Sequence, residues 1–235
     1  MSAPIVIEPR FRGPPESANG GYACGRIAVE LGLPVAVRLL APPPLATTLA
    51  LREDGQRNRW LLLDGERPVA EARPAGVAID VPAPPSHEAA VEAARRCPGL
   101  VHHPLPTCFV CGPQRAPGDG LRIFAGPVEG RPLVAAPWVP DDSLADGRGR
   151  VRPEFVWAAL DCPGFFAAPL GGSLALLGEL AARIEGSVLP GERCVVIGWP
   201  VASEGRKHRT GTAVFAADGR LVARAEATWV VLRQA

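Results

Sequence analysis

Apolar and polar residues alternate in two stretches of the chain, and each stretch follows a segment with the features of a helix. Alternation of this kind is typical of half-buried strands. It predicts strands at 5–12, 35–40, 47–52, 59–63, 69–77, 121–124, 133–136, 194–201, 211–216 and 221–232. Residues 174–184 fit a strand or a helix equally well. Asp-Gly pairs at 64–65 and 218–219 are typical of tight hairpin turns.

The first helix is predicted to begin after Asn19, a suitable N-cap, and to end near Leu31. It contains Gly20, Gly21 and Gly25, although glycine is a poor helix former. Three glycines in one short helix indicate that some group must approach its backbone closely. That group is either a bound molecule or a neighbouring element of the fold, in which case the glycines serve packing alone.

The second helix is predicted to open at Pro153, which suits a first helical position. Residues 155–160 are all apolar, and a helix that is apolar on every side is a buried one. Asp161 follows directly, and Pro163 should kink or end the helix. A carboxylate in apolar surroundings is a candidate acid or base. The alternative is that Asp161 ends the helix near solvent or caps a neighbouring backbone N–H.

The two stretches share a sequence pattern, which indicates an internal repeat. Residues 64–72 and 218–225 both contain an Asp-Gly turn and then Val-Ala-x-Ala at the start of a long strand. Internal repetition predicts architecture more strongly than local propensity does. We therefore expect two copies of one unit, a helix wrapped by antiparallel strands, at 1–81 and 113–235. Residues 82–112 form the connection, with a short helix at 86–96.

Composition narrows the function classes. The chain has 235 residues and a formal net charge of +1, so nothing favours nucleic acid or an anionic membrane as a partner. Neither a signal-peptide core nor an apolar run of membrane-spanning length is found. We therefore expect a cytoplasmic protein, and its six cysteines are expected to be free thiols.

One cysteine pair has the spacing of half a zinc site. Cys108 and Cys111 are separated by two residues, and a structural zinc ion takes four ligands. Cys97, His102 and His103 lie near enough in sequence to supply the others. Because no second Cys-x-x-Cys pair exists, the sequence favours two packed thiols in a loop, and we expect no metal.

The two helix openings resemble those of the hotdog-fold thioesterase superfamily. Asn19-Gly20-Gly21 matches the Gly-Gly turn that opens the helix in phenylacetate-type thioesterases. Trp157 falls at the aromatic position of that family, and Ala159-Leu160-Asp161 falls at its Leu-Ala-Asp. Residues 108–112 and 120–123 are similar to segments of bacterial members. Two units in one chain resemble double-hotdog acyl-CoA thioesterases, which implies an α+β fold: two antiparallel sheets, each wrapping a long central helix.

Each half of the chain keeps the part of the family's site that the other half lacks. The first half has the Gly-Gly turn but carries Ala28 at the position of Asp161. The second half has Asp161 but carries Pro153-Glu154 in place of the turn. Sites of this family combine the turn of one unit with the acid of the other. The resemblance therefore implies one complete site, Asn19-Gly20-Gly21 facing Asp161, and one inactive site.

The resemblance implies hydrolysis of an acyl-CoA or acyl-carrier thioester. The N–H groups of Gly20, Gly21 and Tyr22 would stabilise the oxyanion, because the first N–H groups of a helix have no intrahelical partner. Asp161 would activate water as a base or attack as a nucleophile. Asn19 is either part of this site or only an N-cap. No cofactor is expected beyond the coenzyme A of the substrate.

Further residues are candidates for substrate binding. Arg206, Lys207 and Arg209 form the densest basic run and could meet the phosphates of coenzyme A, or could be a solvated hairpin. Tyr22 and Trp157 are further candidates for contact with the substrate. The aromatic residues Trp157, Phe165 and Phe166 belong either to the core, which the sequence favours, or to an acyl pocket.

Two other functions share these features. A non-catalytic acyl-CoA-binding hotdog protein would need the pocket and the turn but not Asp161. An acyl-CoA hydratase of the same fold would need an Asp-x(4)-His pair, which is absent around Asp161. A homo-oligomer of double-hotdog chains is compatible with each function.

Overall fold

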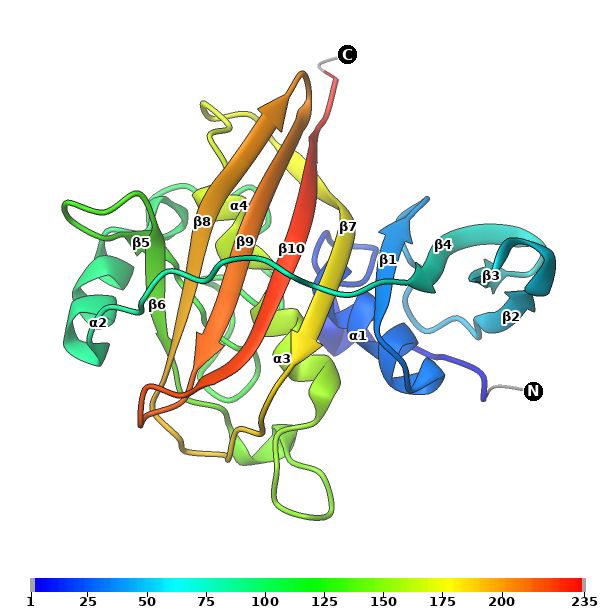
Figure 1. Cartoon of the computed structure of the whole chain (residues 1–235), viewed down its shortest axis with the longest axis horizontal. Helices are drawn as coiled ribbons and strands as arrows, with labels where there is room; N and C mark the ends of the chain where they lie inside the picture. The colour runs from blue at the N-terminus through cyan, green and yellow to red at the C-terminus, as the bar shows by residue number, and fades with distance from the viewer. Residues whose placement is uncertain (1–2, 234–235) are drawn as a thin grey trace.

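In the computed structural model, which describes residues 3–233, the strands form one antiparallel sheet (Figure 1). Their order across the sheet is β2-β3-β4-β1-β7-β10-β9-β8-β6-β5. The strands are β1 (Val35–Leu39), β2 (Ala50–Asp54), β3 (Arg59–Asp64), β4 (Arg67–Pro74), β5 (Gly126–Pro127), β6 (Val134–Trp138), β7 (Ala175–Ile184), β8 (Cys194–Glu204), β9 (Lys207–Phe215) and β10 (Leu221–Val231). The helices are α1 (Gly20–Leu31), α2 (His87–Arg95), α3 (Pro153–Ala159) and α4 (Cys162–Ala167).

The strands of the two halves meet at a single pairing, between β1 and β7. Three residue pairs make this contact, from Ala36 opposite Ala181 to Arg38 opposite Glu179. On one side of it lie β2–β4, and on the other lie β5, β6 and β8–β10. The sheet is therefore continuous rather than two separate sheets.

Helix α1 forms as its sequence predicts. The Asn19 side chain accepts a hydrogen bond from the Tyr22 N–H at 2.9 Å, and Gly32 ends the helix with a φ of 65°. A Cβ atom on Gly25 would lie 2.7 Å from Trp157 Cβ, so α1 packs backbone-close against α3. The glycines of α1 thus permit a close approach between two helices.

The second helix differs from the expected long central helix. Helix α3 ends at Ala159, and a separate short helix, α4, begins at Cys162. Pro163 has no N–H for an intrahelical bond, so a continuous helix is disfavoured there. The Thr212 hydroxyl donates to the Leu160 carbonyl at 2.8 Å and satisfies this acceptor at the break. The helix thus ends before Pro163, close to where the sequence predicted a kink or an end, and the long central helix that the resemblance implied is divided into α3 and α4.

Two predicted strands are also absent. Residues 5–12 contain only isolated bridges, Ile5 to Leu49 and Arg12 to Ala18, with a 3₁₀ turn at Pro9–Phe11 between them. Residues 121–124 form no strand, and Arg122 has a φ of 54°. Their apolar side chains alternate because the segment lies against the loop around Cys108, where the Ile123 N–H donates to the Val110 carbonyl at 2.9 Å. Residues 174–184, which fitted either element, contain strand β7.

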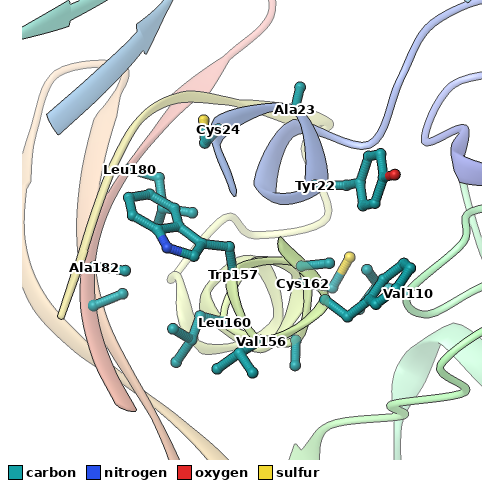
Figure 2. Packing of buried hydrophobic residues seen from close by; sticks show 14 of the residues in the cluster. Tyr22, Ala23, Cys24, Val110, Val156, Trp157, Leu160, Cys162, Leu180 and Ala182 are labelled. Carbon is teal, nitrogen blue, oxygen red and sulfur yellow. The ribbon is translucent and has the colours of Figure 1, made fainter. Parts of the chain in front are cut away.

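Three of the helices and the segment 75–86 lie on opposite faces of the sheet. Helices α1, α3 and α4 lie on one face, and residues 75–86 cross the other face in front of β7–β10 (Figure 1). In the main core, Trp157 points toward Leu180 and Ala182 of β7, while Tyr22 points to the other side of α1 (Figure 2). No helix among residues 3–233 is both long and apolar enough to span a membrane.

Candidate active site

Asp161 lies at the break between α3 and α4, opposite the first turn of α1. Its Oδ2 atom accepts hydrogen bonds from Asn19 Nδ2 at 2.7 Å and from the Gly21 N–H at 2.9 Å. The structure thus brings together the Gly-Gly turn of the first half and the acid of the second half. The same Asn19 side chain caps α1 through its Oδ1 atom, so one residue serves both the helix and the carboxylate.

The close contact at Gly21 depends on its missing side chain. A Cβ atom at this position would lie 2.5 Å from Asp161 Cβ and 2.8 Å from the Trp157 carbonyl oxygen. Both atoms belong to rigid parts of the fold and could not move aside cheaply. Gly21 is therefore required for α1 to reach the carboxylate.

The Asp161 carboxylate is buried and only half satisfied. Its Oδ1 atom makes no hydrogen bond with any residue in 3–233. Burial raises the pKa of Asp161 to about 7, and the negative charge of a Cys108 thiolate would act in the same direction. The bonds from Gly21 and Asn19 favour the charged form but do not offset the loss of solvation. Asp161 is thus a carboxyl group that can both take and release a proton near neutral pH.

A cavity of about 390 Å³ opens next to this carboxylate. Asn19, Gly20 and Asp161 form part of its wall. Most other wall residues are apolar, among them Leu39, Leu105, Phe165, Leu174, Leu177 and Trp229. An apolar cavity with a few convergent polar groups is the usual form of a small-molecule site.

The first turn of α1 has one N–H group without a partner among the described residues, at a residue that lines this cavity. The Gly21 N–H is bonded to Asp161, and the Tyr22 N–H is bonded to Asn19. The Gly20 N–H makes no hydrogen bond within residues 3–233. Of the three N–H groups expected to face a thioester oxygen, Gly20 alone is both unpaired and at the cavity wall.

Comparisons with known proteins give a fold. No protein-family model matches the sequence, and no curated protein is similar to it. A crystal structure described as a candidate thioesterase from Novosphingobium aromaticivorans is similar over 98% of this chain and 95% of its own, with a TM-score of 0.62 and 15% identity. The TesB protein of Mycobacterium avium subsp. paratuberculosis is similar over 94% of this chain and 89% of its own, with a TM-score of 0.61 and 14% identity.

The fold of this chain is the hotdog fold, as in these two structures. Since identity is low, this likeness concerns the fold, and the chemistry must be argued from the residues of this chain.

Two of the predicted substrate-binding residues lie in the hotdog core instead. Tyr22 is buried and stacks on Phe11, with ring centroids 4.3 Å apart. Trp157 is buried between α1 and β7, where it contacts Gly25. Neither residue lines the cavity next to Asp161. Their rings fill the contact between helices and sheet, and a contact of either residue with a substrate stays a prediction.

Two residues of the basic run line a second cavity, which adjoins the first. Lys207 and Arg209 line a second cavity of about 470 Å³, which shares Leu39, Gly178 and Val230 with the first. Arg38 of β1 also lines it, a residue that the sequence pattern gave no reason to select. Arg209 is ion-paired with Glu226 at 2.8 Å. Arg206, in contrast, donates to the Val231 carbonyl at 3.0 Å and does not line this cavity.

Three cysteines also line the main cavity beside Asp161. The sulfur atoms of Cys108, Cys111 and Cys162 lie within 4.8 Å of one another. Hydrogen bonds from the other two thiols, with help from the backbone N–H groups of Cys111 and Val110, hold the pKa of Cys108 well below its usual value. The pKa values of Cys111 and Cys162 are raised, first of all by Cys108. Sequence reasoning missed Cys162 because it follows Cys108 only after a long stretch of chain.

The positions expected for the inactive site, Glu154 and Ala28, lie at the other end of the contact between α1 and α3. Glu154 is buried and lies 3.8 Å from Arg152, and Ala28 is partly buried in the packing of α1. Neither Glu154 nor Ala28 lines either cavity.

Proposed function

We propose that this protein hydrolyses an acyl-CoA thioester at the wall of the main cavity, with Asp161 as general base or nucleophile. The observation that carries the proposal is the Asp161 carboxylate. It is buried, it is held on Oδ2 by Asn19 and Gly21, and its Oδ1 is unpaired among the described residues. A carboxylate fixed through one oxygen and free at the other is suited to a single proton transfer or a single attack.

The chemistry follows from the atoms at hand. As a base, Asp161 Oδ1 would take a proton from water while the water oxygen attacks the thioester carbonyl carbon. The Gly20 N–H would stabilise the oxyanion that forms; its lack of a partner at the start of α1 supports this role. The C–S bond then breaks, the proton passes to the departing thiolate, and a carboxylic acid and a free thiol leave.

The two adjoining cavities suggest how the substrate is held. The apolar walls of the first suit an acyl chain. Lys207 and Arg38 in the second make no ion pair within residues 3–233, so both could meet phosphate groups of coenzyme A. Glu179 and Glu204 also line this second cavity and would limit its affinity for anions.

We infer a double-hotdog architecture for the same chain. Helix α1 with β1–β4 would form one unit within 1–81, and α3 and α4 with β6–β10 would form the other within 113–235. Residues 82–112 connect them. The pairing of β1 with β7 and the contact between α1 and α3 are what two such units side by side require. On this view one of two equivalent sites has kept its acid and its turn.

The proposal is tested by hydrolysis of a panel of acyl-CoA esters, with the released thiol as the readout. Asp161→Asn should lower kcat by about 10²–10⁴-fold, the usual contribution of a positioned base. The amide keeps the shape of the carboxylate, and its oxygen can still accept from Asn19 and Gly21. Glu154→Gln, a buried acid outside the cavity, is the matched control and should leave kcat within about twofold.

Other outcomes would contradict the proposal. Unchanged hydrolysis in Asp161→Asn would remove Asp161 from the chemistry. Binding of acyl-CoA by the unaltered protein with no turnover of any ester would favour the non-catalytic function instead. Turnover of acyl-carrier esters alone would move the substrate class from coenzyme A to a carrier protein.

A further inference from the structure

The three cysteines beside Asp161 form a cluster that the proposed hydrolysis does not use. Cys108 and Cys111 lie on the loop after α2, and Cys162 is the first residue of α4. Their sulfur atoms all lie within 4.8 Å of one another, and the Cys108 and Cys162 sulfurs are 3.8 Å apart. Zinc binds thiolates at about 2.3 Å, so two sulfurs on one tetrahedral ion lie about 3.8 Å apart. The spacing is thus that of ligands to a common ion.

The loop that carries two of these cysteines has a tight turn. The Gly112 N–H donates to the Cys108 carbonyl at 2.9 Å. A Cβ atom on Gly112 would lie 2.5 Å from that carbonyl oxygen, so only glycine fits directly after Cys111. The turn brings both thiols of the Cys-x-x-Cys pair to one side of the loop, where they meet Cys162.

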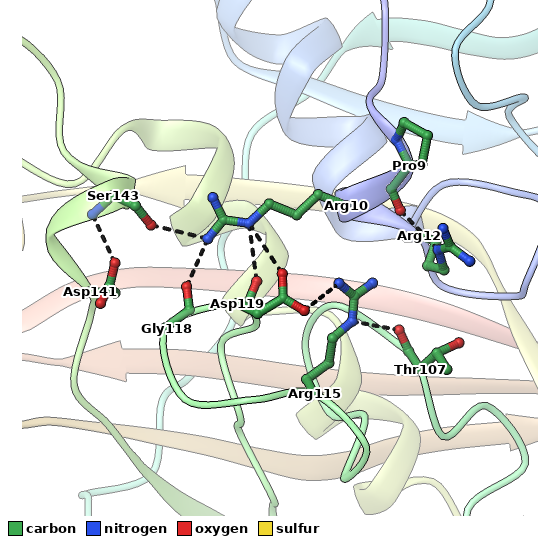
Figure 3. Close-up of polar contacts among 9 residues, drawn as sticks. All are labelled: Pro9, Arg10, Arg12, Thr107, Arg115, Gly118, Asp119, Asp141 and Ser143. Atoms are coloured by element: carbon green, nitrogen blue, oxygen red, sulfur yellow. Dashed lines mark hydrogen bonds and ion pairs between the residues drawn. The ribbon is translucent and has the colours of Figure 1, made fainter.

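The same loop is held firmly by arginine side chains (Figure 3). Arg10 donates to the carbonyls of Asp119 and Gly118 at 3.1 and 2.9 Å. Arg115 donates to the Thr107 carbonyl at 2.8 Å and to the Asp119 carboxylate at 2.9 Å. These contacts fix both ends of the loop, so the thiols are positioned before any ligand arrives. Preorganised ligands of this kind are what a metal site requires.

The cavity side of the cluster is where a fourth ligand would be found. Cys108, Cys111 and Cys162 all line the cavity. His103 lies beside them, with Nε2 3.3 Å from the Cys111 sulfur. Its Nδ1 atom accepts from the Leu105 N–H at 3.0 Å, so in the neutral ring the proton is on Nε2. His103 is therefore placed to donate to a sulfur rather than to bind an ion.

We propose that Cys108, Cys111 and Cys162 bind a zinc ion at the cavity wall, with the fourth coordination position open to the cavity. Thiolates select zinc among common divalent ions, and three protein ligands with one open position are typical of zinc sites that exchange a ligand. The proposal does not depend on the hydrolysis of thioesters. It revises the expectation of two packed thiols, because the fold supplies a third.

Metal analysis of the full chain tests the site directly. The protein is expressed with zinc in the medium, purified with a non-thiol reductant and no metal-affinity tag, and its metals are counted by mass spectrometry. About one zinc ion per chain is expected. Cys108→Ser, Cys111→Ser and Cys162→Ser should each lower the zinc content at least tenfold. Cys194→Ser, at a buried cysteine of β8 far along the chain from the cluster, should keep it.

The ligand set is tested by replacing zinc with cobalt. The absorption of the cobalt protein should show thiolate charge-transfer bands and a tetrahedral visible spectrum, and His103→Ala should leave both unchanged. Loss of the metal in His103→Ala would overturn the open fourth position. Zinc retained in Cys162→Ser, or iron or copper found in place of zinc, would overturn the ligand set or the metal.

If a serine variant does not fold, a second test uses the unaltered chain. A small alkylating reagent is applied to native protein with and without a zinc chelator, and modified cysteines are identified by peptide mass. The chelator should expose Cys108, Cys111 and Cys162 to alkylation while Cys24 and Cys194 stay protected. Equal modification under both conditions, a disulfide between Cys108 and Cys162, or no zinc in the unaltered chain would overturn the site.

Discussion

Gly21→Ala tests whether the contact between α1 and the Asp161 carboxylate matters for function. The added methyl group would lie 2.5 Å from Asp161 Cβ and 2.8 Å from the Trp157 carbonyl oxygen. Nonbonded carbon atoms prefer separations of about 3.5–4.0 Å, so α1 and α3 must move apart by roughly 1 Å at this point. That movement lengthens the 2.9 Å bond from the Gly21 N–H to Asp161 beyond hydrogen-bonding distance.

The expected loss of stability has three contributions. Overpacking of a close contact costs about 1–3 kcal/mol. The lost hydrogen bond to a charged group costs about 1.5–3 kcal/mol. Replacing glycine by alanine within a helix stabilises the helix by about 1 kcal/mol, which offsets part of this loss. The free energy of unfolding of Gly21→Ala should therefore fall by about 1.5–5 kcal/mol, measured by urea denaturation of the purified variant.

Gly25→Ala is the matched control in the same helix. Its methyl group would lie 2.7 Å from Trp157 Cβ and 2.8 Å from Glu154 Cα, a clash of similar severity that does not touch Asp161. We expect Gly25→Ala to lose stability without losing kcat, and Gly21→Ala to lose kcat by about tenfold or more. The reasoning would be refuted if Gly21→Ala were as stable as the unaltered protein, or if both variants lost the same activity.

Two further predictions concern the basic hairpin and the helix break. Lys207→Glu should raise KM for acyl-CoA about fivefold with kcat nearly unchanged, because it reverses one exposed charge in the second cavity. For a short thioester without phosphates, KM should not change. An equal rise in KM for both esters would exclude phosphate binding in this cavity. Thr212→Val removes the buried 2.8 Å bond to the Leu160 carbonyl and should lower the free energy of unfolding by about 1–3 kcal/mol in urea. Thr47→Val, at a half-buried loop threonine, should change it by less than about 0.5 kcal/mol, and equal losses would show that the helix break needs no such bond.

Local signals in the sequence predicted the elements whose ends are locally determined. Helix α1 has its N-cap at Asn19 and its stop at Gly32, and both are found. The hairpin between β3 and β4 turns at Gly65 with a φ of 60°, as the Asp-Gly pair predicted. These signals depend on residues that are close together in the sequence, so they hold whatever the tertiary packing is.

Features that depend on distant partners were not predictable in this way. Residues 121–124 have an apolar pattern because they pack on the loop of Cys108, not because they pair in a sheet. Trp157 and Tyr22 are aromatic because they fill the core. The proximity of Cys162 to Cys108 follows from the break before α4, and no spacing rule covers ligands from two separate segments.

The resemblance selected Asn19-Gly20-Gly21 and Asp161 as parts of one site, because each half of the sequence carries the part that the other lacks. The structure places the Gly-Gly turn against Asp161. The sequence could not show that the N–H groups of Gly21 and Tyr22 donate to other residues of the protein. Of these three N–H groups, only that of Gly20 has no partner among the described residues. Donor direction depends on the distance between α1 and α3, and this distance is a property of the packed helices.

The stability of Asp161→Asn distinguishes a functional carboxylate from a structural cap. Buried polar atoms that serve the fold alone are normally hydrogen-bonded, whereas Asp161 Oδ1 has no partner among residues 3–233. A buried charge with half of its bonds missing opposes folding. The neutral amide can accept the same two bonds through its oxygen, so the free energy of unfolding should rise by about 1 kcal/mol or more, while kcat falls. Gain of stability with loss of activity is the signature of a residue retained for function. A clear loss of stability in urea denaturation would instead assign Asp161 to the fold alone.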